Sequence, residues 1–478
     1  MGYIKPTMKK SYLLIFGFFC FEIATSNAQF TVLHNFNDTN GGHPYGSLIL
    51  SGRTLFGMAV YGGKYNRGCI FSIDTNGAEY KTLLDFNDTN GTGADGSLIT
   101  SGKVLYGMTG HGGVNGMGCI FSIDTNGSRY KDLYDFNGLY GGYPQGSLVL
   151  SGGILYGLAS GYPTNDGCVF SIDTNGSGYK DILNFNGTNG ANPFGSLVLS
   201  GNVLYGMTAF GGTSASSCSC SGYGLIFSVK TDGSKYKNLL NFNGVNGEEP
   251  WGSLTLLKGV LYGMTYYGGI HSMGNIFSID TNGYRYKDLL DFNDTNGSQP
   301  IGSLIISGGV LLGMSGNGGG GKNGKGNIFS IDTNGSEYTD LFDFNGINGE
   351  FPKDNLTLSG NVLYGMTPDG GTDTAGVIFR FKDATMGINQ VSASPDCISI
   401  FPNPSNGSFN LRETNAHQLM VNSSVEIYNM LGEKIYTAKI NATNTQIDLS
   451  NNPSGIYLYR VITETGGLVS EGKLVIQK

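Results

Sequence analysis

Short apolar segments separated by glycine-rich turns recur along most of the chain. From Phe30 to about Lys382 each unit contains four of them, of the form G-S-L-I-x-S, x-V-L-Y-G-M-T, x-I-F-S-I-D and Y-K-x-L-L-D-F-N. Each segment is rich in β-branched and aromatic residues and is bounded by turn residues, which is typical of β-strands. Successive residues of 104–108 are expected on opposite faces of a strand, and along 80–86 the residues Tyr80, Thr82, Leu84 and Phe86 alternate with Lys81, Leu83 and Asp85, so both faces carry apolar side chains.

The units repeat with a period of about 50 residues. The glycine of the L-Y-G-M segment stands at Gly57, Gly107, Gly157, Gly206, Gly263, Gly313 and Gly365. Four strands in a unit of this length are typical of a β-propeller blade. The sequence therefore predicts an all-β fold with a seven-bladed β-propeller over residues 29–383.

The two ends of the repeat array are out of phase, and this predicts how the ring closes. The array opens at 30–37 with a segment that matches a fourth strand, and it ends at 377–381 with a third strand whose fourth is missing. We expect the N-terminal strand to complete the last blade, which leaves no unpaired sheet edge at the junction.

Composition and the N-terminus predict an exported protein. Charged residues make up 13% of the chain against about 25% in a typical protein, and the formal net charge is -8. This acidic balance argues against a nucleic-acid partner. Residues 1–28 combine lysines, an apolar run and Ser26-Asn27-Ala28, as expected of a signal peptide. Because no later segment has the length of a membrane span, we expect no transmembrane segment.

The cysteines and the acidic turns give little reason to expect a metal site or a cofactor, and we predict neither. Cys69, Cys119 and Cys168 occupy one repeat position that holds Leu, Asn or Val elsewhere, so we expect small packing residues. Cys218 and Cys220 lie in an insertion of one unit, where a local disulfide is an open alternative. The recurring D-T-N-G is expected to form a hairpin turn rather than a calcium site.

The repeat resembles two known families of tandem repeat. The Gly-Gly pairs after the second strand are similar to the doublet of kelch propellers, although tyrosines such as Tyr80 and Tyr130 stand near the place of the kelch tryptophan. The units resemble more closely the GloVer repeat of secreted bacterial proteins. That resemblance implies a propeller and no established chemistry.

The C-terminal region resembles the sorting domain of the type IX secretion system of Bacteroidetes. After a predicted linker at 384–397, residues 398–478 contain F-P-N-P-S-N-G-S-F-N-L, V-E-I-Y-N-M-L-G-E-K-I-Y, I-D-L-S-N-N-P-S-G-I-Y-L-Y-R-V and a terminal K-L-V-I-Q-K. The alternating apolar pattern predicts a small Ig-like β-sandwich. The resemblance implies export through the periplasm by the type IX machinery, followed by release or attachment to surface lipopolysaccharide.

Two positions vary between units whose neighbours hardly change, and these are the candidate ligand-binding residues. The middle of the P-x-G turn before the first strand holds Tyr45, Asp95, Gln145, Phe194, Trp251, Ile301 and Lys353. The position three residues after the Met of the second strand, or after Leu158 in the third unit, holds Tyr61, His111, Gly161, Phe210, Tyr267, Asn317 and Asp369. We expect both sets on the long-loop face of the propeller, the first near the mouth of the central channel.

The predicted function is binding or adhesion, with an extracellular polysaccharide or protein as ligand. Aromatic residues among polar ones suit stacking on sugar rings or docking of another surface molecule. No catalytic motif is present, and the five histidines are scattered. Two alternatives stay open: a polysaccharide-degrading enzyme with loop-face acids among Asp95, Glu249, Glu350 and Asp369, and a structural surface protein without a small ligand. The protein is expected to be a monomer.

Overall fold

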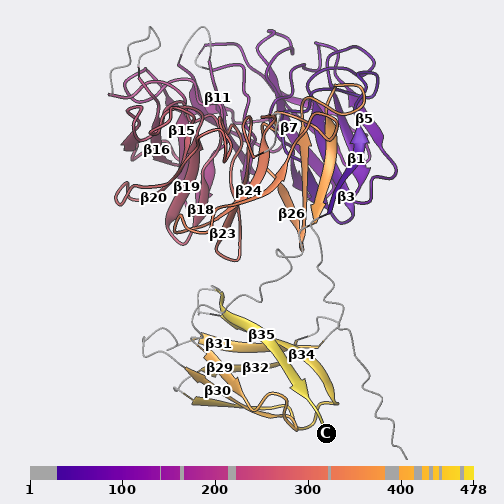
Figure 1. Cartoon of the computed structure of the whole chain (residues 1–478). Coiled ribbons are helices and arrows are strands. Elements are labelled where there is room, and N and C mark those ends of the chain that lie inside the picture. The colour runs from indigo at the N-terminus through magenta and orange to yellow at the C-terminus, as the bar shows by residue number, and fades with distance from the viewer. Residues whose placement is uncertain are drawn as a thin grey trace, which may run out of the picture.

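The computed structural model describes residues 29–139, 141–161, 166–213, 222–320, 324–382, 398–413, 423–429, 434–440, 444–462 and 468–478. The predicted signal peptide, the linker, Cys218 and Cys220 lie outside the described residues. In the described part of the chain, no helical segment has the length and hydrophobicity of a membrane span. Figure 1 shows an all-β protein, as predicted.

The described residues between 29 and 382 form seven four-stranded antiparallel sheets (Figure 1). The innermost strands are β2 (Ile49–Ser51), β6 (Ile99–Ser101), β10 (Val149–Ser151), β14 (Val198–Ser200), β18 (Thr255–Leu257), β22 (Ile305–Ser307) and β26 (Thr357–Ser359). The second strands are β3 (Thr54–Ala59), β7 (Val104–Thr109), β11 (Ile154–Ala159), β15 (Val203–Thr208), β19 (Val260–Thr265), β23 (Val310–Ser315) and β27 (Val362–Thr367).

The third and fourth strands complete each sheet toward its outer edge. The third strands are β4 (Cys69–Asp74), β8 (Cys119–Asp124), β12 (Cys168–Asp173), β16 (Leu225–Lys230), β20 (Asn275–Asp280), β24 (Asn327–Asp332) and β28 (Val377–Lys382). The fourth strands are β5 (Lys81–Asp85), β9 (Lys131–Asp135), β13 (Lys180–Asn184), β17 (Lys237–Asn241), β21 (Lys287–Asp291), β25 (Thr339–Asp343) and, in the last sheet, β1 (Gln29–Asn35).

The N-terminal strand closes the array, as the phase of the repeat predicts. β1 pairs with β28 from Gln29 opposite Lys382 to Asn35 opposite Val377. A hydrophobic cluster at this junction combines Leu55 of the first unit with Tyr364 of the last. The two ends of the repeat array therefore meet in one sheet and against one core.

Hydrophobic cores lie between neighbouring sheets, because both faces of each sheet carry apolar residues. One core joins Met58 and Phe86 of the first unit to Leu105 and Phe121 of the second, and equivalent clusters recur around the array. The repeated methionine thus packs between sheets, as expected. A Cβ on the repeated Gly107 would lie 2.5 Å from Cζ of Phe121, so only glycine leaves room for that ring.

The fourth strands differ in one respect from the strict alternation that we expected. Each β-ladder between third and fourth strands shifts register by one residue, for instance between Ile70 and Phe71, so Leu83 is an extra residue on its strand. Leu83 and Leu84 both pack against the core shared with the next unit. The expected alternation was wrong here because a bulge turns two successive apolar side chains to the same core.

Cys69, Cys119 and Cys168 are buried free thiols within β4, β8 and β12. Burial raises the pKa of Cys69 and Cys119 to about 12. These thiols are therefore protonated packing residues, as their repeat position predicts.

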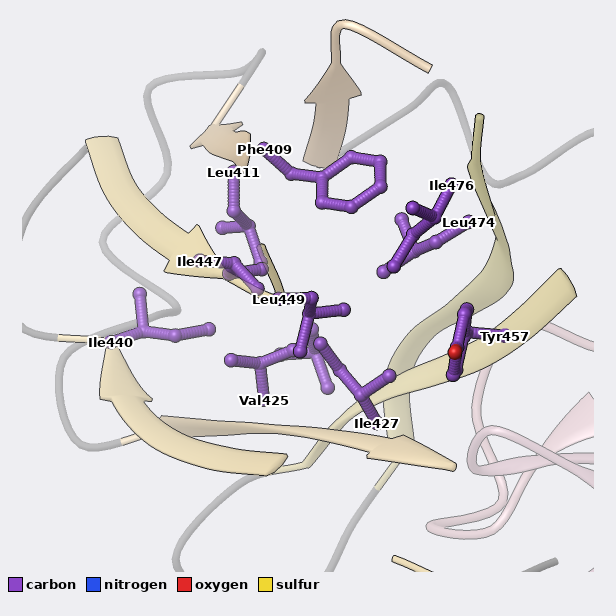
Figure 2. Packing of buried hydrophobic residues seen from close by; sticks show 11 residues of the cluster. Phe409, Leu411, Val425, Ile427, Ile440, Ile447, Leu449, Tyr457, Leu474 and Ile476 are labelled. Atoms are coloured by element: carbon purple, nitrogen blue, oxygen red, sulfur yellow. The ribbon is translucent and has the colours of Figure 1, made fainter. Parts of the chain in front are cut away.

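The C-terminal region forms two sheets with one core between them. β29 (Ile398–Phe401), β30 (Ser408–Glu413) and β33 (Asn444–Asp448) form one sheet. β31 (Ser423–Tyr428), β32 (Lys434–Ile440), β34 (Gly455–Ile462) and β35 (Leu468–Ile476) form the other. Figure 2 shows Phe409 and Leu411 of the first sheet facing Val425, Ile427 and Leu474 of the second. This is the predicted β-sandwich.

Candidate binding site

The turns that precede the innermost strands meet around the central channel. In each turn the backbone N–H of one serine donates to Oγ of the corresponding serine in the next unit, and Asn355 takes the place of serine in the seventh unit. The bonds are 2.6 to 3.0 Å long and join Ser47, Ser97, Ser147, Ser196, Ser253, Ser303, Asn355 and again Ser47. We call this closed set the serine ring.

The glycine before each serine allows the turns to approach this closely. A Cβ on Gly96, Gly146 or Gly195 would lie 2.0 to 2.1 Å from a carbonyl oxygen of the next turn. No side chain fits at that distance, so the glycine of P-x-G-S belongs to the architecture of the channel. Only the seventh unit has a side chain at this position, and it is Asp354.

A cavity of about 250 Å³ lies above the serine ring. All seven residues at the middle of the turns line it, from Tyr45 of the first unit to Lys353 of the last. The structure thus brings together the complete first set of variable residues, at the mouth of the channel where the sequence predicted it. We call this cavity the channel pocket.

Consecutive units give the channel pocket one aromatic and aliphatic side, formed by Phe194, Trp251 and Ile301. The ring centroids of Phe194 and Trp251 are 5.3 Å apart, and Tyr266 stacks on Trp251 at 5.1 Å. The indole Nε1 donates to Oε2 of Glu249 at 3.2 Å. Because the ring is held from two directions, the surface that it presents to the cavity is preformed.

The opposite side is polar and is formed by Lys353, Tyr45, Asp95 and Gln145. Nζ of Lys353 lies 3.9 Å from the centroid of the Tyr45 ring. Burial raises the pKa of Asp95 to about 7, and the nearby Lys353 ammonium only partly offsets this. Burial also lowers the pKa of Lys353, although the Asp369 and Asp95 carboxylates act in the opposite direction.

The floor of the pocket contains a carboxylate that our reading of the sequence missed. Asp354 Oδ2 accepts a hydrogen bond from Oγ of Ser97 at 3.1 Å, and Oδ1 accepts one from the Asn355 N–H at 2.8 Å. Burial raises the pKa of Asp354 to about 6, while hydrogen bonds from Asn355, Ser47 and Ser97 oppose the shift. The sequence does mark this position, because the seventh unit alone has Asp-Asn where the other six units have Gly-Ser.

The second set of variable residues does not line the channel pocket. These residues pair with the loops that lead into the turns, through bridges such as Gly42 with Tyr61 and Thr92 with His111. Asp369 Oδ1 lies 3.0 Å from Nδ1 of His43, in the loop before Tyr45. The remaining members make comparable contacts: His111 with Tyr143, Phe210 with Phe194, Tyr267 with Tyr266 and Asn317 with Gln299.

The second set therefore supports the loops that carry the pocket. Gly161, its third-unit member, lies at the same level with its N–H bonded to the Gly142 carbonyl. The two sets share one face of the propeller, as predicted, but only the first faces the cavity.

The loop-face acids are dispersed rather than paired. Glu249 accepts from Trp251, Glu350 forms an ion pair with Lys325, and Asp369 contacts His43. Of the four candidates only Asp95 lines the channel pocket. Among the described residues, no group of three or more His, Cys, Asp or Glu side chains is placed to hold a metal ion.

Two family models match the chain. The Gloeobacter/Verrucomicrobia repeat matches residues 18–219 and 212–394, and the secretion system C-terminal sorting domain matches residues 399–477. The sorting domain indicates that the protein is exported and is either secreted or held at the cell surface. No curated protein matches the chain.

Solved structures with a similar fold are distant in sequence. Puromycin hydrolase is 11% identical with a TM-score of 0.50, and the match covers 88% of this chain and 59% of that chain. The extracellular domain of BT4673 from B. thetaiotaomicron is 14% identical with a TM-score of 0.47, over 93% of this chain and 58% of that one. Polysaccharide lyase Uly1 is 11% identical with a TM-score of 0.48, over 73% and 91%.

This chain spans less than two thirds of the first two structures, and the similarity to puromycin hydrolase concerns the fold alone. The repeat model, in contrast, matches most of the sequence. The chain therefore belongs to the Gloeobacter/Verrucomicrobia repeat family and carries a type IX secretion sorting domain at its C-terminus.

Proposed function

We propose that the protein is an extracellular binding module that recognises carbohydrate in the channel pocket. The observation that carries this proposal is the convergence of seven non-repeating side chains on one cavity, with an aromatic side opposite a polar side. Sugar rings have an apolar C–H face and a hydroxyl edge, so a cavity with these two sides matches both. Export to the cell surface or beyond brings such a module into contact with extracellular glycans.

The aromatic side is preformed, which favours binding. Trp251 is held by Tyr266 and by its hydrogen bond to Glu249, so little side-chain entropy remains to be lost when a ligand stacks on it. Aromatic side chains in well-packed pockets contribute most to binding in many interfaces, often 2 kcal/mol or more. Trp251 is therefore the residue on which the proposal is tested.

The test is a screen of immobilised glycans with the wild-type chain, Trp251→Ala and a matched control, Tyr284→Ala. Tyr284 is 70% exposed and lies in the hairpin turn after β20, away from the pocket. We expect Trp251→Ala to weaken binding at least about 30-fold, and Tyr284→Ala to leave it unchanged. Equal loss in both variants, or binding that is indifferent to Trp251, would contradict the proposed site.

A catalytic role is the second candidate, and one observation favours it. Asp95 has a pKa of about 7 and shares the cavity with the carboxylate of Asp354. A carboxylic acid that is half protonated near neutral pH is suited to general acid catalysis of glycoside cleavage. Release of reducing sugar from a bound glycan, abolished by Asp95→Asn, would identify an enzyme; binding without release supports the module. Absence of both leaves the structural surface protein.

A further inference from the structure

We propose that the channel pocket recognises the end of a neutral glycan chain, and that Lys353, Asp354 and Asn355 of the seventh unit set this mode of recognition. The inference rests on the proposed function and deepens it. It concerns which part of a glycan enters the pocket and which sugars are excluded. The shape, the floor and the charge of the cavity each contribute one step.

The shape restricts what can reach the floor. Seven turns surround the cavity, and each contributes one side chain to its wall. Its volume of about 250 Å³ is below the range of about 300 to 1,000 Å³ that is usual for ligand pockets. A chain lying across the face would touch only the upper parts of these side chains. A chain end, in contrast, can place one sugar unit against the serine ring.

The seventh unit adds a side chain to the floor of the pocket. Six units have glycine at this position, where the backbone of the next turn leaves no room for a Cβ, and Asp354 occupies the seventh. Its carboxylate accepts a hydrogen bond from Ser97, two units further around the ring, so the side chain links the seventh turn to the second. An Asp-Asn turn therefore leaves less room at this level than the Gly-Ser of the other units, which favours a chain end over a chain that threads through the channel.

The floor also supplies hydrogen-bonding groups of both kinds. Ser147, Ser196, Ser253 and Ser303 line the cavity, and each Oγ accepts a backbone N–H from the preceding turn. Their hydroxyl protons can therefore be donated to a ligand. Asp354 is an acceptor on the same floor. Alternating donors and an acceptor suit the hydroxyl groups at the terminal unit of a sugar chain.

The charge of the lining opposes acidic sugars. Asp95 and Asp354 face the cavity with Lys353 as their one cationic neighbour in the lining. The Asp369 carboxylate is close enough to raise the pKa of Lys353, and its own negative charge adds to that of the two acids in the lining. A uronate or a sulfate would be brought next to two acidic side chains that already share the one ammonium group of the lining. Uncharged sugars do not meet this repulsion.

The experiment uses the full chain and a neutral polysaccharide that the wild type binds in the screen described above. Intact polymer and the same polymer cut to short oligosaccharides are compared as soluble competitors at equal mass. End recognition predicts that potency rises with the number of chain ends, so a tenfold increase in ends lowers the inhibitory mass concentration about tenfold. A potency that is unchanged or reduced by shortening overturns the inference.

The double variant Asp354→Gly, Asn355→Ser tests the seventh unit directly, because it restores the Gly-Ser of the other six and is compatible with the fold. We expect at least a tenfold loss of affinity for the short oligosaccharides. His271→Ala, an exposed residue of the same face outside the lining, is the matched control with no loss. Wild-type affinity in the double variant contradicts the role of Asp354.

Uronic acid oligosaccharides of the same length are the third competitor, and equal competition by them contradicts the exclusion of acidic sugars. The two levels of the proposal fail differently. If the wild type binds no glycan at all, the proposed function is wrong and the inference falls with it. If it binds intact polymer better than fragments, glycan binding stands and only end recognition is wrong.

Discussion

The fourth and the seventh turn at the channel occupy equivalent places but differ in what they contribute. The fourth reads Pro-Phe-Gly-Ser at 193–196, and its Gly195 and Ser196 do what their counterparts do in five other units. The seventh reads Pro-Lys-Asp-Asn at 352–355. Asn355 keeps the hydrogen bonds of the serine ring, while Lys353 and Asp354 add charge to the cavity.

The difference separates two kinds of position in a repeat protein. Residues that all or all but one of the units share, such as the glycine beside Phe121 or the serine of the ring, maintain the packing of neighbouring sheets and turns. Residues that differ between units face the cavity or hold the loops around it. If this distinction is right, substitutions at shared positions change stability, and substitutions in the seventh turn or on the rim change the properties of the pocket.

The largest effect on stability is expected from Phe121→Ala, at a shared position. Phe121 is fully buried between the first and second sheets, and its ring fills the space left by Gly107. Deleting a buried phenylalanine costs about 3 to 5 kcal/mol of unfolding free energy. The urea midpoint measures this loss. Val114→Ala, at an 83% exposed residue of the same unit, should stay within about 0.5 kcal/mol, and a similar midpoint for both would contradict the distinction.

A smaller effect of opposite sign is expected from Asp95→Asn on the rim. Because the pKa of Asp95 in the folded protein is about 7, above the ordinary value of an aspartate, the folded state binds this proton more tightly than the unfolded state. The unfolding free energy should therefore fall as pH rises from about 4 to about 7. We expect Asp95→Asn to stabilise the protein by about 2 kcal/mol at pH 8, after allowance for partial exposure, and to have little effect at pH 4.

Urea midpoints at pH 4, 6 and 8 for the wild type and Asp95→Asn check this expectation. Asp354, whose pKa is about 6, contributes a pH dependence of the same sign, so the variant should flatten the profile only in part. Parallel pH profiles for the two proteins would show that folding does not raise the pKa of Asp95.

The smallest effect is expected at the serine ring. Ser196→Ala removes the acceptor of the Ser147 N–H at 2.7 Å, which costs about 1 kcal/mol. Asn355→Ser is the complementary change, since it installs the residue of the other six units, and it should alter the unfolding free energy by less than about 0.5 kcal/mol. A larger loss from Asn355→Ser than from Ser196→Ala would mean that the seventh unit depends on its amide in a way that the ring does not explain.

Much of the fold could be predicted because the same pattern of strand and turn residues occurs in seven units. Strand positions, the hairpin at D-T-N-G and the pairing of the N-terminal strand with Val377 to Phe381 all follow from pattern and phase, and the structure agrees with them. The bulge at Leu83 could not be read in this way. A bulge depends on how two neighbouring sheets share apolar side chains, and the local pattern of one strand does not contain that information.

The channel pocket was predictable in part. The variable residue of each turn stands four residues before the start of an innermost strand, so a ring of such strands brings Tyr45, Trp251 and their counterparts together. The division into two sides also follows from their order in the chain, but only once the ring is known to close. The second variable set was grouped with the first, although the structure separates them by the bridges of the supporting loops.

Asp354 stands at a position that is constant in the other six units, so the search for variable residues does not find it. A glycine that is repeated six times and then lost marks a place where the architecture no longer requires an empty position. What replaced it could be seen in the sequence. Its hydrogen bond to Ser97, in another unit, could not be seen, because that contact depends on the curvature of the whole ring.

The pairing of β1 with β28 affects how the protein responds to proteases outside the cell. A protease that cuts one surface loop of an open stack separates it into two pieces. Here the first and last strands belong to the same sheet, so the pieces on either side of a single nick remain joined by that sheet and by the core beside it. The closing strand thus gives the two pieces a second non-covalent interface, which should slow their separation after a single cut.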